Sequence, residues 1–239
     1  HYILLYLMNS SIYAFICTRS KKLSKTTEKL VSYLSRAKVE VKLLVGANSI
    51  FEGYQKAFDK VNPNPNDIII MCHDDVEIVS TSEHFRSVLT RELLLQKDVG
   101  FIGPAGTTEL SNNAVWWDQE QWKLNKHSGM VFHGNSLTDC NTTFYGPYRR
   151  VVVLDGLFLA AKASTIKDIG LDKPEEFEGN WDFYDITYTM RAHEKGYHNK
   201  AAPILIIHNS SGELAGRDSW HKNRQAFIDK YKFEFPFKV

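Results

Sequence analysis

The sequence predicts an α/β fold in which a mostly parallel sheet is flanked by helices within a single domain. In the first half of the 239 residues, short apolar runs alternate with segments that repeat apolar residues at helical spacing. This strand–helix–strand order is typical of parallel sheets with crossover helices. The run from Ile68 to Met71 has no polar alternation, which indicates a strand covered on both faces.

The first half contains three predicted strands joined by two helices. The strands span Ile12–Cys17 and Val39–Val45, followed by the run that begins at Ile68. Apolar residues at helical spacing cover Lys21–Arg36 and Ile50–Val61, so each strand is followed by a crossover helix of ordinary length. The arrangement resembles half of a doubly wound nucleotide-binding sheet.

The second half is less regular. Tryptophans and glycines interrupt Glu109–Tyr148, which predicts irregular structure with short strands that covers a ligand. The other predicted elements are a helix at Glu83–Lys97, strands at Val99–Gly103, Val151–Asp155 and Leu157–Ala161, a helix at Ala163–Ile169, a helix from Asp182 to Gly196, a strand at Pro203–Ile207, and a closing helix around Trp220–Tyr231. We place one domain at residues 11–232, with a nucleotide-binding half at 11–106, an acceptor and catalytic half at 107–232, and an N-terminal segment at 1–10.

The composition argues against several partners and compartments. A net charge of +1 gives no electrostatic basis for binding nucleic acid. Three cysteines without metal-like spacing do not suggest a disulfide framework, which favours a reducing compartment. No apolar run is long enough to form a transmembrane segment. We therefore expect a cytoplasmic protein, or one attached to a membrane through parts outside this sequence.

An acidic motif follows the third strand, in the order His73-Asp74-Asp75-Val76-Glu77. Ligands of open α/β sheets bind beyond the carboxyl ends of the strands, and carboxylates there are suited to a divalent cation with a phosphate ligand. An acidic turn without a ligand is the alternative explanation. No Gly-x-Gly-x-x-Gly follows the first strand, and no Gly-Lys-Ser/Thr is present, so a metal would have to hold the phosphates of any bound nucleotide.

Three further positions are candidates for the same site. Asp182 and Asp185 are predicted in the first turn of a helix, where capping and the helix dipole would also explain them. His208 ends the last predicted strand, and a parallel sheet would place it on the same edge as Asp75. Gly156 interrupts a strand, which often marks close backbone approach by a ligand.

With these parts in place, the sequence resembles the family-2-like glycosyltransferases of the GT-A fold over about residues 11–220. Each motif is weak alone, but their order and spacing together are fairly specific. The motifs are His73-Asp74-Asp75-Val76, Gly100–Gly106, Trp116-Trp117, Asp155–Leu159, Tyr184-Asp185-Ile186 with Arg191, and His208–Gly212.

The resemblance implies a nucleotide-sugar donor, with a UDP-sugar favoured, held by Mn²⁺ or Mg²⁺. Asp75 and His208 would ligate the metal, and Asp74 would face the ribose or the donor sugar. The usual Asp-x-Asp is replaced here, which makes Glu77 a rival second acid. Side chains alternate along a strand, so Asp75 and Glu77 are expected to share a face. Nitrogen and oxygen ligands together favour Mn²⁺ over Mg²⁺.

The resemblance also implies the catalytic base. In the family, a Glu-Asp pair lies six residues ahead of an arginine, and Tyr184-Asp185 lies six residues before Arg191. Asp185 therefore matches the base that deprotonates the acceptor hydroxyl, with inversion at the anomeric carbon. Tyrosine replaces the usual glutamate, so the first acid is either missing or has moved to Asp182.

The remaining binding residues follow from the same resemblance. The nucleobase and ribose of the donor would lie near Thr18, Arg19 and Asn48, after the first two strands. The donor or acceptor sugar would lie near Trp116 and Trp117, for which packing beneath a long loop is the alternative. The loop from His208 would close over the diphosphate, with Arg217 as a cationic clamp.

Two other functions fit parts of the pattern. A non-catalytic module that binds carbohydrate or nucleotide would explain Tyr184 and the altered acidic motif. A nucleotidyltransferase shares the sheet and the acidic metal site but normally carries an early glycine-rich loop. The segment Thr18–Lys25 contains no glycine, which argues against that class.

Overall fold

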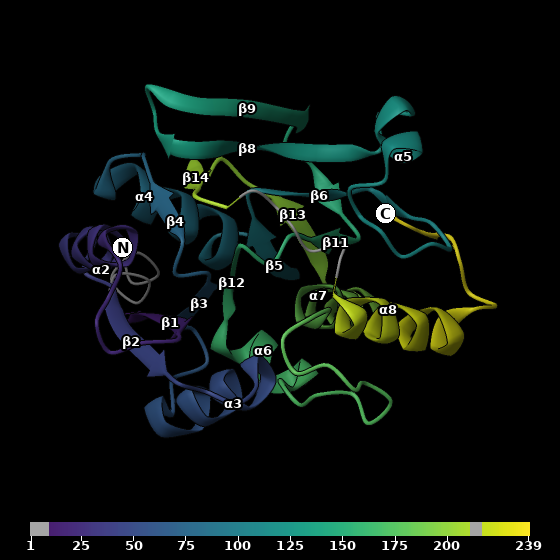
Figure 1. The fold of residues 1–239 in the computed structure, drawn as a ribbon, viewed down its shortest axis with the longest axis horizontal. Helices are drawn as coiled ribbons and strands as arrows, with labels where there is room; N and C mark the ends of the chain where they lie inside the picture. The colour runs from purple at the N-terminus through teal and green to yellow at the C-terminus, as the bar shows by residue number, and fades with distance from the viewer. Residues whose placement is uncertain (1–9, 211–216) are drawn as a thin grey trace.

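A seven-stranded sheet forms the centre of the computed structural model, which describes residues 10–210 and 217–239 (Figure 1). Its strands, in spatial order, are β10 (Arg150–Val151), β13 (His198–Ala201), β5 (Val99–Gly103), β12 (Phe158–Lys162), β3 (Ile68–Cys72), β1 (Ile12–Thr18) and β2 (Glu40–Val45). β12 runs antiparallel to β3 and β5, and β10 runs antiparallel to β13, while the other pairs are parallel. The predicted mostly parallel α/β sheet is therefore confirmed.

Side-chain caps start the helices that follow the first strands. Ser24 accepts a hydrogen bond from the backbone of α2, and Ser49 does the same for α3, so each serine satisfies an amide at a helix start. α3 packs on β1 and β2, and α7 packs on β5, β11 and β13. The helices are α2 (Lys25–Arg36), α3 (Ile50–Val61), α4 (Ser82–Leu89), the π-helical turn η1 (Thr90–Leu94), α5 (Gln119–Lys123), α6 (Ala163–Ile169), α7 (Tyr184–Glu194) and α8 (Asp218–Tyr231).

A second sheet lies against the first and differs most from the sequence-based expectation. Its strands, in spatial order, are β11 (Val153–Leu154), β6 (Ala105–Thr107), β8 (His127–Ser136), β14 (Ile206–His208) and β4 (Val76–Ile78), with β9 (Asp139–Gly146) paired to β8. The stretch predicted as irregular thus contains a long β8–β9 hairpin, along the top of Figure 1. The last predicted strand, β14, belongs to this sheet, and β13 was not predicted.

Two helix predictions also need correction. The helix expected at Glu83–Lys97 is α4 followed by the shorter η1 turn. Asp182 precedes α7, because Phe183 adopts a left-handed backbone with φ of 67° and separates it from the first turn. Asp185 does lie in that first turn, as predicted.

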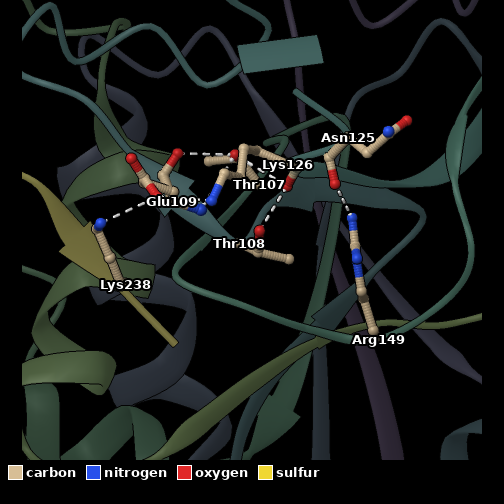
Figure 2. Close-up of polar contacts among 7 residues, drawn as sticks. All are labelled: Thr107, Thr108, Glu109, Asn125, Lys126, Arg149 and Lys238. Carbon is tan, nitrogen blue, oxygen red and sulfur yellow. Dashed lines mark hydrogen bonds and ion pairs between the residues drawn. The ribbon is translucent and has the colours of Figure 1, made fainter. Parts of the chain in front are cut away.

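The C-terminus is tied to the second half of the fold beyond residue 232, where the sequence analysis ended the domain. β15 (Phe237–Lys238) pairs antiparallel with β7 (Glu109–Leu110). Figure 2 shows the polar contacts around this pair: Glu109 lies 3.0 Å from the Lys126 ammonium and 3.4 Å from that of Lys238. The Thr108 hydroxyl donates to the Lys126 carbonyl at 2.8 Å. These contacts join the C-terminal strand to the segment that enters β8.

No helix in the described part of the chain is long and apolar enough to cross a membrane.

Candidate functional site

The acidic motif lies where the chain passes from one sheet to the other. β3 ends at Cys72, and the backbone amide of His73 donates to the Leu157 carbonyl at 3.1 Å. Asp74 and Asp75 then form a turn, and β4 begins in the second sheet. The motif therefore follows the carboxyl end of a buried strand, as predicted, but it also forms the link between two sheets.

The second sheet brings His208 to the same place. β14 runs antiparallel to β4 with His208 opposite Val76, and the backbone amide of Asn209 donates to the Asp75 carbonyl at 2.8 Å. Sequence analysis expected His208 and Asp75 on one edge of a single parallel sheet. The structure places them side by side through antiparallel pairing in the second sheet instead.

Asp75, His73 and His208 form a compact cluster. Asp75 Oδ1 lies 3.4 Å from His208 Nε2 and 3.7 Å from His73 Nδ1. One ligand atom from each residue lies within 4.8 Å of the other two, which identifies these residues as a potential metal site within 10–210 and 217–239. Asp75 Oδ1 is buried without a hydrogen-bond partner. A buried acceptor of this kind, facing two imidazoles, fits a cation, and two imidazole nitrogens with one carboxylate oxygen suit a divalent transition metal.

The charges of the cluster also suit a cation. Burial would raise the pKa of Asp75, but the close approach of the His208 imidazole and, after it, that of His73 outweigh burial and lower this pKa below its ordinary value. Burial lowers the pKa of His73. Burial alone would also lower the pKa of His208, but Asp75 raises it above its ordinary value. The carboxylate is thus ionised at neutral pH and His73 is neutral, as a metal ligand must be, whereas His208 would release the proton that Asp75 stabilises when a metal binds.

Tyr184 and Gly156 connect this cluster to helix α7. The Tyr184 hydroxyl lies 2.9 Å from His73 Nε2 and donates to the Gly156 carbonyl at 2.8 Å. A Cβ on Gly156 would lie 2.5 Å from that hydroxyl oxygen and 2.8 Å from Asp185 Cβ. The sequence suggested that a ligand approaches Gly156 closely. In the structure Tyr184 and Asp185 fill that space, so the glycine has a packing reason that requires no ligand.

Asp185 also contacts Gly156, through its carboxylate. The Gly156 backbone amide donates to Asp185 Oδ2 at 2.9 Å. Burial first, and the nearby charge of Asp155 second, raise the pKa of Asp185 to about 7. Asp155 is itself anchored on the same short segment, because its Oδ1 accepts the Leu157 amide at 3.1 Å. A carboxylate with a pKa near neutrality is suited to accept a proton during a reaction.

Asp182, the other predicted catalytic acid, contacts the start of α8. Its Oδ2 accepts the Ser219 hydroxyl at 2.6 Å, and its Oδ1 lies 3.7 Å from Arg217 Nη1. The residue is 4% exposed. The structure thus brings Asp182 and Arg217 together. The loop predicted to close over the diphosphate falls largely on residues 211–216, which lie outside the described residues.

The other two acids of the motif do not join Asp75 in the cluster. Glu77 Oε2 forms an ion pair with Lys29 Nζ at 3.2 Å, on the outer edge of β4. The backbone carbonyl of Asp74 accepts a hydrogen bond from the Thr27 hydroxyl at 2.9 Å, which ties the turn to helix α2. Of the three acids, Asp75 is the one that lies between the two histidines.

The predicted nucleotide contacts lie at the carboxyl ends of the first two strands. Thr18 ends β1, and its carbonyl accepts the Gly46 amide at 3.0 Å, which joins the two strand ends. Arg19 and Asn48 are exposed just beyond these ends. Because β1 is parallel to β2 and β3, all three positions lie on the same sheet edge as the cluster.

The two tryptophans differ in exposure. Trp116 is 3% exposed and packs against Tyr145 at a ring-centroid distance of 5.1 Å. Trp117 is 37% exposed and lies 5.7 Å from the ring of Trp220 on α8. Trp117 can therefore offer a face to a sugar ring, whereas Trp116 is a core residue.

Sequence analysis missed three residues near the cluster. His73 stands in the motif without an assigned role, and only the 3.7 Å separation of its Nδ1 from Asp75 Oδ1 indicates one. His133 lies opposite His208 on β8, with their ring centroids 5.9 Å apart. Asp155 was quoted only as part of a motif, although its charge acts on Asp185. No sequence pattern pointed to His133, because β8 lies in the stretch predicted as irregular.

Comparisons with known proteins concern the family and the fold. A model of a glycosyltransferase-like family matches residues 7–231. No curated protein matches the chain at a significant level. Among solved structures, the chain is similar to the crystal structure of GalNAc-T7 with UDP, GalNAc and Mn²⁺. The TM-score is 0.55 at 10% identity, covering 93% of this chain and 50% of that one.

A second solved structure, that of A197 from STIV, has a TM-score of 0.46 at 12% identity over 84% of this chain and 95% of that one. The GalNAc-T7 likeness supports the fold, and the chain spans about half the length of that protein. The family match covers nearly the whole described chain, including every residue of the cluster and helix α7.

Proposed function

The chain belongs to the glycosyltransferase-like family and is an enzyme of the glycosyltransferase class, and we propose that it transfers a sugar from a nucleotide-diphosphate sugar to an acceptor hydroxyl. A UDP-sugar is the favoured donor, since the fold is similar to a structure that contains UDP. A hydroxyl of a glycan or glycoconjugate is the proposed acceptor. The observation that carries this proposal is the His73–Asp75–His208 cluster, which Tyr184 and Gly156 link to Asp185.

The cluster is proposed to hold Mn²⁺, with Mg²⁺ as the alternative. Its ligands would be Asp75 Oδ1, His208 Nε2 and His73 Nδ1, the three atoms that face one another. A divalent cation there would neutralise the charge that develops on the diphosphate leaving group. Glu77, expected as a rival ligand, is proposed to keep its ion pair with Lys29 instead.

Asp185 is the proposed general base. Its pKa of about 7 means that about half of the carboxylate is ionised at neutral pH, which lets it take the proton of an attacking hydroxyl. The Gly156 amide holds Oδ2 and so orients the carboxylate. An attack assisted from the side opposite the leaving group inverts the anomeric carbon.

The remaining site residues are proposed to bind the two substrates. Thr18, Arg19 and Asn48, with Asp74, would contact the nucleoside at the strand ends. Trp117 would stack on a sugar ring. Arg217 would bind the donor diphosphate, and Asp182, which it faces at 3.7 Å, would orient its guanidinium.

A thermal-shift comparison of nucleotide sugars with and without Mn²⁺ tests this proposal. A donor at 100 times its Kd is expected to raise the Tm by about 5–10 °C for a chain of this size, and only with the metal present. Equal shifts without metal would contradict a metal-dependent donor site. Binding without release of UDP across an acceptor panel would instead indicate the non-catalytic module.

A further inference from the structure

We propose that Tyr184 is a positioning residue that fixes the tautomer of His73 and thereby presents its Nδ1 to the metal. This inference rests on the proposed function where it concerns the metal. The hydrogen bonds that set the tautomer, however, join protein atoms alone. It starts from one hydroxyl group that contacts two partners, His73 Nε2 at 2.9 Å and the Gly156 carbonyl at 2.8 Å.

The direction of the two hydrogen bonds follows from their chemistry. A tyrosine hydroxyl has one proton to donate, and a carbonyl oxygen can only accept. The Tyr184 proton is therefore directed to Gly156. The contact with His73 then requires that Nε2 carries the proton and donates it to the tyrosine oxygen. The opposite arrangement would leave two oxygens 2.8 Å apart without a proton between them.

The tautomer decides which nitrogen can bind a cation. A neutral imidazole with its proton on Nε2 has a free lone pair on Nδ1. That atom is the one that faces Asp75 Oδ1, at 3.7 Å. Without the tyrosine, the proton could move to Nδ1 and donate toward the carboxylate, which would close the metal position with a hydrogen bond.

Tyr184 is held rigidly enough for this role. It is 5% exposed, and its ring packs edge-on against Tyr54 at 6.0 Å and Phe51 at 6.5 Å between centroids. A Cβ on Gly156 would lie 2.5 Å from its hydroxyl oxygen, so only glycine allows the approach. Burial raises the pKa of Tyr184 well above its ordinary value, so the hydroxyl keeps its proton. The packing of Tyr184 therefore holds its hydroxyl between His73 and the Gly156 carbonyl.

The chain offers a matched control on the same helix. Tyr188 is fully buried, and its hydroxyl donates to the Leu171 carbonyl at 2.9 Å. Tyr184→Phe and Tyr188→Phe each remove one buried hydroxyl and leave one carbonyl without a partner, but only the first hydroxyl contacts His73. Any loss of Mn²⁺ affinity caused by general destabilisation of α7 should appear in both variants.

Isothermal titration of the metal-free protein with MnCl₂ tests the proposal. Tyr184→Phe is expected to weaken Mn²⁺ binding about 10–100-fold, as loss of a partner to a metal-bound histidine does, while Tyr188→Phe stays within about twofold. In a His73→Ala background, Tyr184→Phe should cause no further loss. An equal loss in that background, or affinity unchanged by Tyr184→Phe, would overturn the role of Tyr184.

A second measurement needs no metal. Nitrogen-15 NMR of imidazole-labelled protein at pH 7 should show His73 protonated on Nε2 in the wild type, with a shift of population toward Nδ1–H in Tyr184→Phe. The same tautomer in both proteins would contradict the proposal even if both fold normally. If wild type has this tautomer but binds no Mn²⁺, the metal assignment fails, while the control of the His73 tautomer by Tyr184 stands.

Discussion

Asp75 and Asp185 are linked through Gly156 and Tyr184, and their surroundings give them opposite charge behaviour. Asp75 faces two imidazoles, which lower its pKa below the ordinary value. Asp185 is half-buried near Asp155, and loss of contact with water and that like charge raise its pKa to about 7. The same functional group is therefore kept ionised in one place and able to take up a proton in the other.

The comparison shows that the partners of a carboxylate, rather than its residue type, determine what it can do. One acid among histidines is suited to a cation, and one acid near another acid is suited to proton transfer. Substitution of each carboxylate, or of the acid near it, should therefore change metal binding and proton transfer separately.

The largest effect is expected from Asp75→Asn. An amide brings no charge to the two histidines, so Mn²⁺ affinity should fall by more than the ~100-fold that loss of an indirect partner costs. Metal-dependent transfer should be lost with it. Titration with MnCl₂ and an assay of UDP release measure both. Transfer at the wild-type rate in this variant would remove Asp75 from the site.

Asp185→Asn should affect the reaction and leave the metal in place. Loss of a general base lowers kcat by about 10²–10⁴-fold. The donor KM and the Mn²⁺ affinity should change little, because the cluster keeps its three ligands. Steady-state kinetics with saturating Mn²⁺ separates the two constants. A collapse of donor affinity at nearly normal kcat would make Asp185 a binding residue.

The stability of the same variant has a definite pH dependence. The pKa of Asp185 is raised from 3.8 to about 7 in the folded state, so its contribution to stability is present below pH 4 and is lost as the pH rises through 7. Asn cannot ionise, and at pH 8 Asp185→Asn should have a Tm at least about 2 °C higher than wild type. At pH 4 that advantage should vanish. Equal differences at both pH values would show that Asp185 is not buried in its charged form.

Asp155→Asn tests why Asp185 titrates near neutrality. Removing the like charge should lower the pKa of Asp185, although burial, the larger cause, remains. In wild type, kcat/KM should rise with pH through about 7 as Asp185 ionises. In the variant this rise should move to lower pH. An unmoved profile would assign the titration to another group, such as His208.

The smallest effect is expected from Glu77→Gln. Its carboxylate pairs with an exposed lysine, Lys29, and surface pairs of this kind contribute about 0–1 kcal/mol. Mn²⁺ affinity should stay within about threefold of wild type, in contrast with Asp75→Asn. A loss as large as that of Asp75→Asn would make Glu77 the second acidic ligand after all.

Sequence patterns predicted the part of the fold that depends on local periodicity. β1, β2 and β3 and their helices follow from buried apolar runs and helical spacing, and Asp75 was placed at the end of β3 for the right reason. His208 was also placed near Asp75, but through the wrong sheet. A three-residue strand such as β14 has too little pattern to reveal its partners.

Other features depend on contacts that no local pattern shows. His73 contacts Tyr184, which is 111 residues away in the chain. Gly156 suggested a close approach, but only the folded structure shows that Tyr184 makes it. The β8–β9 hairpin was hidden because its polar, half-exposed strands lack clean alternation. Long-range pairing, rather than composition, decides these features.

The central claim is that two histidines and Asp75 hold the metal, and pulsed electron paramagnetic resonance of the Mn²⁺-loaded protein tests it most directly. We predict nitrogen couplings from two imidazoles in the wild type, with one set lost in His208→Ala and the other in His73→Ala. A spectrum without nitrogen coupling, or one unchanged in both variants, would contradict the site.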